Sequence, residues 1–111
     1  MNIIVYGTEK SSETRKALRF LKERRLEHQF RNLGEKSLTE GELKNLCVGG
    51  VRAQDLIDDQ SGTYKTEGFA WREFDAFEAL IDYPSLIKMP ILRVERKVFV
   101  CPDLNTISLI I

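Results

Sequence analysis

The side chains of this chain with the clearest chemical potential gather in one short segment near the N-terminus. They are hydroxyl and basic groups: Lys10, Ser11, Ser12, Thr14 and Arg15. A serine at the start of a helix caps backbone amides, and the remaining amides and the helix dipole attract an anion. The segment therefore indicates either an anion-binding site or a solvated helix face whose serines are only caps.

A serine nucleophile is the other chemistry that this segment could offer, and it would need an adjacent general base. His28 is the only histidine, and it lies early in the second predicted strand, whereas Ser11 follows the end of the first. In a parallel pair of strands these two positions lie roughly 15 Å apart. We therefore do not expect a serine–histidine mechanism.

A β-α-β unit is predicted to position the segment. Ile3–Tyr6 is a β-branched and aromatic run, typical of a buried strand. The helix begins at Ser11 or Ser12, and His28–Leu33 forms a second strand, parallel to the first through a right-handed crossover. One apolar stripe marks the helix face that packs on the sheet: Thr14, Ala17, Leu18, Phe20 and Leu21.

A β-hairpin and a last helix are predicted near the C-terminus. Ile91–Val94 and Val98–Cys101 are two short strands joined by a tight turn around Glu95–Lys97. Asp103 is the expected cap of a short helix whose apolar positions are Leu104, Ile107 and Leu109. On spacing alone, Cys101 is an ordinary strand residue.

The middle of the chain is predicted to be helical. Thr39 and Glu42 have the spacing of a capping box, and Gly49-Gly50 ends that helix. Leu43, Leu46 and Cys47 fall on one of its faces, so Cys47 is expected in the core. Three further helical segments are expected from the apolar spacing: Val51–Ile57, Tyr64–Phe69 and a helix marked by Phe74, Phe77, Leu80 and Ile81.

Composition excludes several classes of function. A chain of 111 residues with 42% hydrophobic residues can bury one core, and its formal net charge of 0 gives no field that would attract nucleic acid. No run of about 18 apolar residues is found, and Cys47 and Cys101 have no metal-like spacing. The N-terminal residues lead directly into a strand, so we do not expect them to be a signal peptide. We expect a cytoplasmic monomer that binds no metal, membrane or nucleic acid directly.

The segment YGTEKSSETRKAL resembles the signature of the arsenate reductase (ArsC)/Spx family of thioredoxin-fold proteins. In that family the first turn usually reads Y-G-x-x-x-C and leads into a helix rich in Lys, Arg and Ala. The likeness continues through FRNL, GG-V-x-A-x-x-LID, TYKTEGFA and YPSLIKMPI to the closing hairpin. It implies one thioredoxin-like (glutaredoxin-like) α/β domain over residues 1–111. Its mixed four-stranded sheet would hold a helical insertion, about 37–88, between the β-α-β half and the hairpin.

The resemblance also assigns site residues. Ser11 stands at the position of the nucleophilic cysteine, and Thr14 stands where some members keep a second cysteine. The Met89-Pro90 bond matches the cis-proline that faces the first turn, and glutaredoxin-like relatives hold glutathione there. Cys101 matches a non-nucleophilic cysteine of some arsenate reductases. The resemblance thus implies a glutathione or anion site at the first turn, with Met89 and Pro90 as its other wall.

Three arginines bind the oxyanion in the arsenate reductases, and this chain has none of them. The matching positions carry Met89, Pro102 after the last strand, and Asp58 or Asp59. We therefore do not expect arsenate reduction, and without a cysteine at position 11 we expect no thiol redox activity.

Three hypotheses follow for the function. The first is a thiol-dependent reductase in which Ser11 is an introduced replacement of the cysteine. The second is a redox-inactive binding module for glutathione or another small anion. The third is an Spx-like regulator that contacts a protein partner such as RNA polymerase. The codon at position 11 of the natural gene separates the first from the others.

Overall fold

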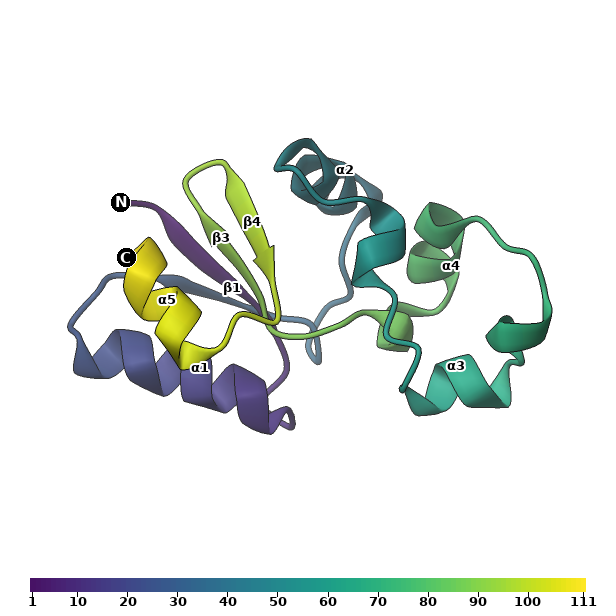
Figure 1. Ribbon diagram of the computed structural model, residues 1–111, viewed down its shortest axis with the longest axis horizontal. Coiled ribbons are helices and arrows are strands. Elements are labelled where there is room, and N and C mark those ends of the chain that lie inside the picture. The colour runs from purple at the N-terminus through teal and green to yellow at the C-terminus, as the bar shows by residue number, and fades with distance from the viewer. The chain divides into compact units, whose positions relative to one another are not determined.

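A mixed four-stranded sheet organises the computed structural model, which describes residues 1–111 (Figure 1). The strands are β1 (Ile3–Gly7), β2 (Gln29–Asn32), β3 (Ile91–Val94) and β4 (Lys97–Val100). Their order in the sheet is β2-β1-β3-β4. β1 runs parallel to β2 and antiparallel to β3, and β3 pairs with β4 as an antiparallel hairpin. The predicted α/β class and mixed sheet are confirmed.

The chain forms two compact units. The first contains Met1–Ser37 and Met89–Ile111, and the second contains Leu38–Lys88. The second unit thus begins and ends within a residue of the helical insertion expected at about 37–88. The single domain over residues 1–111 stays a prediction.

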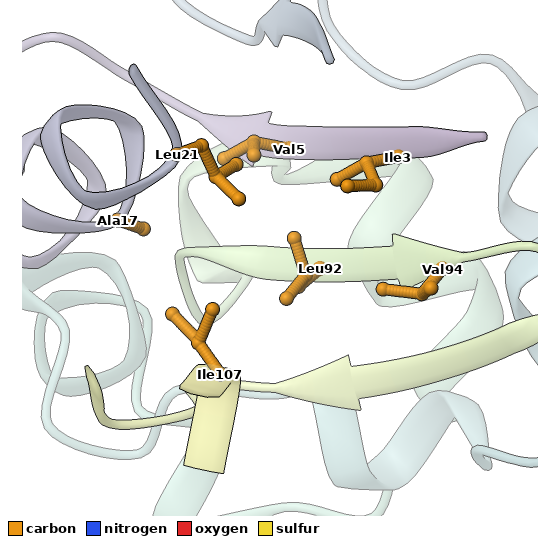
Figure 2. Packing of buried hydrophobic residues seen from close by; sticks show 7 residues of the cluster. All are labelled: Ile3, Val5, Ala17, Leu21, Leu92, Val94 and Ile107. Atoms are coloured by element: carbon orange, nitrogen blue, oxygen red, sulfur yellow. The ribbon is translucent and has the colours of Figure 1, made fainter. Parts of the chain in front are cut away.

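Two helices cover one face of the sheet in the first unit: α1 (Ser12–Glu23) and α5 (Leu104–Ile110). Alternate residues of β1 and β3 point at them and are almost fully buried, as Figure 2 shows. The core residues are Ile3, Val5, Ala17, Leu21, Leu92, Val94 and Ile107. Burial of each large aliphatic side chain contributes roughly 1.5–3 kcal/mol, so this layer holds α1 against β1.

One close backbone contact fixes where α1 begins. The last residue of β1, Gly7, lies against Thr14 in the first turn of α1. A Cβ atom added to Gly7 would stand 2.5 Å from Thr14 Oγ1 and 2.7 Å from Thr14 Cγ2. Thr14 itself is completely buried. Glycine is therefore required at position 7 for lack of space.

The second unit is helical. It contains α2 (Glu40–Val48), α3 (Gly62–Thr66), α4 (Ala76–Asp82) and three 3-10 helices, η1 (Ala53–Leu56), η2 (Phe69–Trp71) and η3 (Pro84–Leu86). Backbone hydrogen bonds join the segment at the end of η1 to the segment at the end of η3: Asp58 N donates to Leu86 O at 2.7 Å, and Lys88 N donates to Leu56 O at 2.8 Å. The buried hydrophobic residues of this unit are Leu43, Leu46, Leu56, Ile57, Phe69, Ala79, Leu80, Leu86 and Ile87.

The predicted helix caps are largely confirmed. Thr39 and Glu42 form the capping box of α2. The Asp103 carboxylate accepts from Thr106 N at 2.7 Å at the start of α5. That backbone hydrogen bond from Thr106, which favours the ionised form, lowers the pKa of Asp103.

Several predicted boundaries are wrong. β4 begins at Lys97 and ends at Val100, so Cys101 lies beyond the strand, with a positive φ of 49°. Phe74 precedes α4 because the side chain of Asp75 caps that helix. Leu109 is 88% exposed, so the apolar face of α5 is narrower than its sequence indicates. The segment expected to be helical at Tyr64–Phe69 divides into α3 and η2.

The Gly7 contact gives a stability prediction. We expect Gly7→Ala to lower the free energy of unfolding by about 1–3 kcal/mol, because the new methyl group overlaps the Thr14 side chain. In Gly7→Ala combined with Thr14→Ala, the loss should be smaller than the sum of the two single losses. Urea unfolding measures all three.

Gly62→Ala is the matched control, because a Cβ there meets nothing within 4 Å. It should be neutral or stabilising by up to about 1 kcal/mol. Equal effects of the two alanine substitutions would contradict the steric explanation.

Candidate functional site

Ser11 is the N-cap of α1. Its backbone is extended (φ −79°, ψ 119°), and its Oγ accepts a hydrogen bond from Thr14 N at 3.2 Å. Its amide donates to Thr8 O at 3.2 Å, which closes the turn after β1. The hydroxyl oxygen is therefore engaged as a cap acceptor, and Ser12 is the first helical residue. The sequence left Ser11 and Ser12 as alternatives for the cap, and the structure selects Ser11.

Backbone amides remain available at this helix end. Ser12 N and Glu13 N make no hydrogen bond within the chain, as is usual for the first turn of a helix. The Arg15 guanidinium donates to Glu9 O at 2.9 Å, which holds its positive charge beside the turn. Lys10 is exposed in the same turn. The amides, the helix dipole and this cation together suit an anion.

The Met89-Pro90 segment contacts the same turn. Its peptide bond is cis, and Thr8 Oγ1 donates to Met89 Sδ at 3.4 Å. Pro90 is buried, and Met89 is half-buried. The structure thus brings Met89 to the turn that precedes α1, although the two segments are about eighty residues apart in sequence.

Cys101 is a neighbour of this site that the sequence analysis missed. Its amide donates to Pro90 O at 2.8 Å, and its thiol donates to Met89 O at 3.5 Å. The strand pattern had extended through Cys101. Pro102 was the signal against that extension, because a proline cannot donate to a strand ladder.

Thr14 has a buried hydroxyl without a partner. Its side chain is completely buried, and Oγ1 makes no hydrogen bond. An unsatisfied buried polar group costs about 1–3 kcal/mol. Thr14 therefore contributes packing against Gly7 and its backbone amide to the cap, and its hydroxyl contributes no hydrogen bond.

No histidine lies near Ser11 to activate it. β1 and β2 pair Ile4 with Gln29, so His28 lies beside the start of β1, whereas Ser11 follows its end. His28 Nδ1 contacts Leu26 O at 2.8 Å and borders a separate cavity of 440 Å³ together with Asn2. The structure thus supports the expectation that Ser11 and His28 do not act together.

The positions matched to the arsenate-binding arginines remain without a cation. Asp58 lies in the second unit, where its carboxylate accepts from Gln60 N at 3.0 Å. Asp59 accepts from Gln60 Nε2 at 3.2 Å. Met89 contacts Thr8, and Pro102 follows Cys101. None of these side chains can neutralise an arsenate oxyanion.

The other cysteine does not provide an activated thiol. Cys47 lies in α2 and is half-buried, so it is less buried than the predicted core position. Burial raises the pKa of the Cys47 thiol, which disfavours the nucleophilic thiolate. Cys47 and Cys101 do not form a disulfide. The chain also has no cluster of three metal-ligating side chains and no helix long and apolar enough to cross a membrane.

Comparison with solved structures identifies the fold. An arsenate reductase from Vibrio cholerae is 22% identical, with 97% of each chain covered and a TM-score of 0.81. A protein from Bacteroides fragilis related to the ArsC family is 20% identical, with 100% of this chain and 98% of that chain covered and a TM-score of 0.83. An ArsC-related protein from Brucella melitensis is 18% identical, with 98% and 93% covered and a TM-score of 0.73.

No protein-family model and no curated protein sequence matches the chain. The similarity is therefore one of structure, and at these identities it establishes the fold. The chain has the thioredoxin-like α/β fold of the ArsC-related proteins over nearly its whole length. The roles of Ser11, Thr14 and the other site residues do not follow from the fold.

The unpaired hydroxyl of Thr14 gives a prediction. We expect Thr14→Val to raise the free energy of unfolding by up to about 1 kcal/mol, because it replaces a buried, unsatisfied hydroxyl with a methyl group of similar shape. Thermal or urea unfolding measures the change. Thr66→Val, at an exposed helical position, should stay within about 0.5 kcal/mol of the original. A clear loss of stability in Thr14→Val would show that the hydroxyl has a partner.

Proposed function

We propose that this chain is a redox-inactive relative of the ArsC-fold thiol reductases. In this proposal it binds a small anionic thiol compound of the glutathione class, without a covalent step, at the turn before α1. The observation that carries the proposal is the state of Ser11. Its oxygen is the cap acceptor for Thr14 N, and the resemblance makes this the position from which the thiolate of the family would attack.

Serine at this place cannot substitute for cysteine. A helix end stabilises a thiolate and lowers the thiol pKa, whereas a hydroxyl is not ionised near neutral pH. A serine nucleophile would need a base, and His28 lies at the other end of β1. Reduction of a disulfide or an oxyanion at Ser11 is therefore not part of the proposal.

Binding needs only the groups that the site retains. The amides of Ser12 and Glu13 and the fixed guanidinium of Arg15 would receive a carboxylate of the ligand. Met89 would form the apolar wall beside its sulfur-bearing chain, and Pro90, which is buried, would lie behind that wall. The set of candidate residues is completed by Lys10, Ser12 and Thr14. Lys10 would contribute an exposed positive charge, Ser12 its backbone amide, and Thr14 only packing.

The Vibrio cholerae neighbour is an arsenate reductase, and we do not extend that activity to this chain. The oxyanion would lose three cationic partners, because Met89, Pro102 and the Asp58-Asp59 pair stand at the matched positions. An acid at one of them would repel the substrate. Arg15 alone does not replace them.

An Spx-like regulator is the second candidate function, and one observation favours it. Trp71 in η2 is 92% exposed, and tryptophan is a residue type that commonly anchors protein interfaces. If the chain retained RNA polymerase in a pull-down and Trp71→Ala did not, a role in transcription would be favoured.

For the binding proposal, we also expect the protein to be a monomer in a reducing, cytoplasmic setting, where Cys47 and Cys101 stay thiols.

The binding proposal predicts a charge-dependent affinity. Glutathione and S-methylglutathione should bind equally well, because no thiol chemistry takes part. Arg15→Gln should weaken both by about threefold to tenfold, the scale of one charge-assisted hydrogen bond lost at a partly exposed site. Isothermal titration calorimetry measures the three affinities.

Arg19→Gln is the matched control. Arg19 is exposed on the same helix one turn away, and the change in net charge is identical. It should leave the affinity within about twofold. Equal weakening by both variants would indicate a diffuse charge effect, and absence of binding to the original protein would overturn the proposed ligand.

A further inference from the structure

An aromatic cavity beside α4 lies in the second unit, and none of the residues discussed as redox or thiol-binding candidates borders it. Its volume is 280 Å³. Phe69 borders the cavity and is 2% exposed, with Phe74 and Tyr83 packed edge-on against its ring at 4.8 and 5.3 Å between centroids. The face of an aromatic ring attracts a cation, so a cluster of three rings beside the cavity suits a cationic ligand.

Carboxylates surround these rings. Asp75, Glu78 and Asp82 border the cavity from α4 and its cap, at a spacing that places them on one face of the helix. Glu73 borders it from the preceding loop. None of the four forms an ion pair within the chain. Like charges at this spacing destabilise a helix, so a positive partner would relieve a standing repulsion.

A guanidinium of the chain itself already lies on one of these rings. The guanidinium carbon of Arg72 lies 4.1 Å from the centroid of the Phe69 ring, and Arg72 borders the same cavity. One guanidinium and four carboxylates border the cavity, which gives it a local formal charge of −3 in a chain whose formal net charge is 0. A planar guanidinium can stack on a ring and pair with a carboxylate at its edge, whereas a lysine ammonium is a compact point charge. The side chains do not form a metal-ligand cluster.

We propose that this cavity binds the guanidinium group of an arginine side chain or of a small arginine derivative. The cation would stack on the Phe69 and Phe74 rings and pair with Glu78 and Asp82. Arg72 is the internal competitor that the external group displaces. This inference goes beyond the proposed function and does not depend on it, because its residues all lie between positions 69 and 83.

The test uses the full-length protein, ¹⁵N-labelled, with Nα-acetyl-arginine amide as the probe and the citrulline analogue as its uncharged control. The arginine probe should shift the amides of Phe74, Glu78 and Ala79, and the citrulline probe should not. Arg72→Ala should bind the arginine probe about threefold to tenfold more tightly, because the internal cation no longer occupies the ring.

Two carboxylate variants complete the test. Glu78→Gln should weaken binding by about threefold or more, whereas Glu67→Gln, an exposed carboxylate outside the cavity, should leave it unchanged. The amide spectra show whether each variant is folded. A glycine–serine peptide with a single arginine distinguishes an arginine in a protein segment from a small arginine derivative. If the peptide binds and Nα-acetyl-arginine amide does not, the ligand is a protein segment. If both probes bind equally, the guanidinium group is sufficient.

Three results would overturn the proposal. They are absence of shifts with both arginine probes in the original protein and in Arg72→Ala, equal binding of the citrulline analogue, and equal effects of Glu78→Gln and Glu67→Gln. Activity or inactivity of the Ser11 site does not change any of these readouts.

Discussion

The contact between Gly7 and Thr14 is the constraint on which the candidate site depends. It sets the distance between the end of β1 and the first turn of α1, and a single methyl group on Gly7 would not fit there. Because Thr14 is held in place, its amide lies within reach of Ser11 Oγ, and Ser11 becomes the cap. The position and direction of the available amides of Ser12 and Glu13 follow from that geometry.

The same geometry explains why a difference of one atom matters at position 11. At a helix N-cap, a thiol would be converted toward a thiolate by the amides and the dipole. A hydroxyl in the same place satisfies an amide and stays neutral. In the proposed function, the helix end would stabilise a thiolate if a cysteine stood at position 11, and with Ser11 the same amides stay available for an anion.

The fold was largely predictable because its signals are local. The β-branched run at Ile3–Tyr6 predicts a strand, and the capping box at Thr39 and Glu42 predicts the start of a helix. Both elements are present, as β1 and α2. The predicted boundaries that are wrong each depend on the conformation or the capping role of a single residue. Cys101 looked like the end of a strand, yet the chain turns there with a positive φ. Phe74 looked helical, yet Asp75 begins the helix after it.

The sites were less predictable because they join distant segments. The spacing of Lys10, Ser11 and Arg15 indicated an anion site, but no pattern in the sequence shows that Thr8 reaches Met89 or that the Cys101 thiol bonds to Met89 O. The aromatic cavity was also missed. Phe69 and Phe74 were assigned to two separate helical segments and Tyr83 was not singled out, and only the folded chain brings the three rings together.

The thiol pKa of Ser11→Cys tests the central claim, that the scaffold is that of a thiol reductase whose chemistry ends at Ser11. In a background with Cys47 and Cys101 replaced by serine, alkylation rates against pH give that pKa. Ser108→Cys, near the C-terminal end of α5, is the matched control.

We predict a pKa well below the ~8.5 of an ordinary cysteine for Ser11→Cys, and an ordinary or higher value for Ser108→Cys. We also predict glutathione-dependent disulfide reduction by Ser11→Cys and none by the serine form. An ordinary pKa at position 11, or turnover by the serine form, would contradict the account.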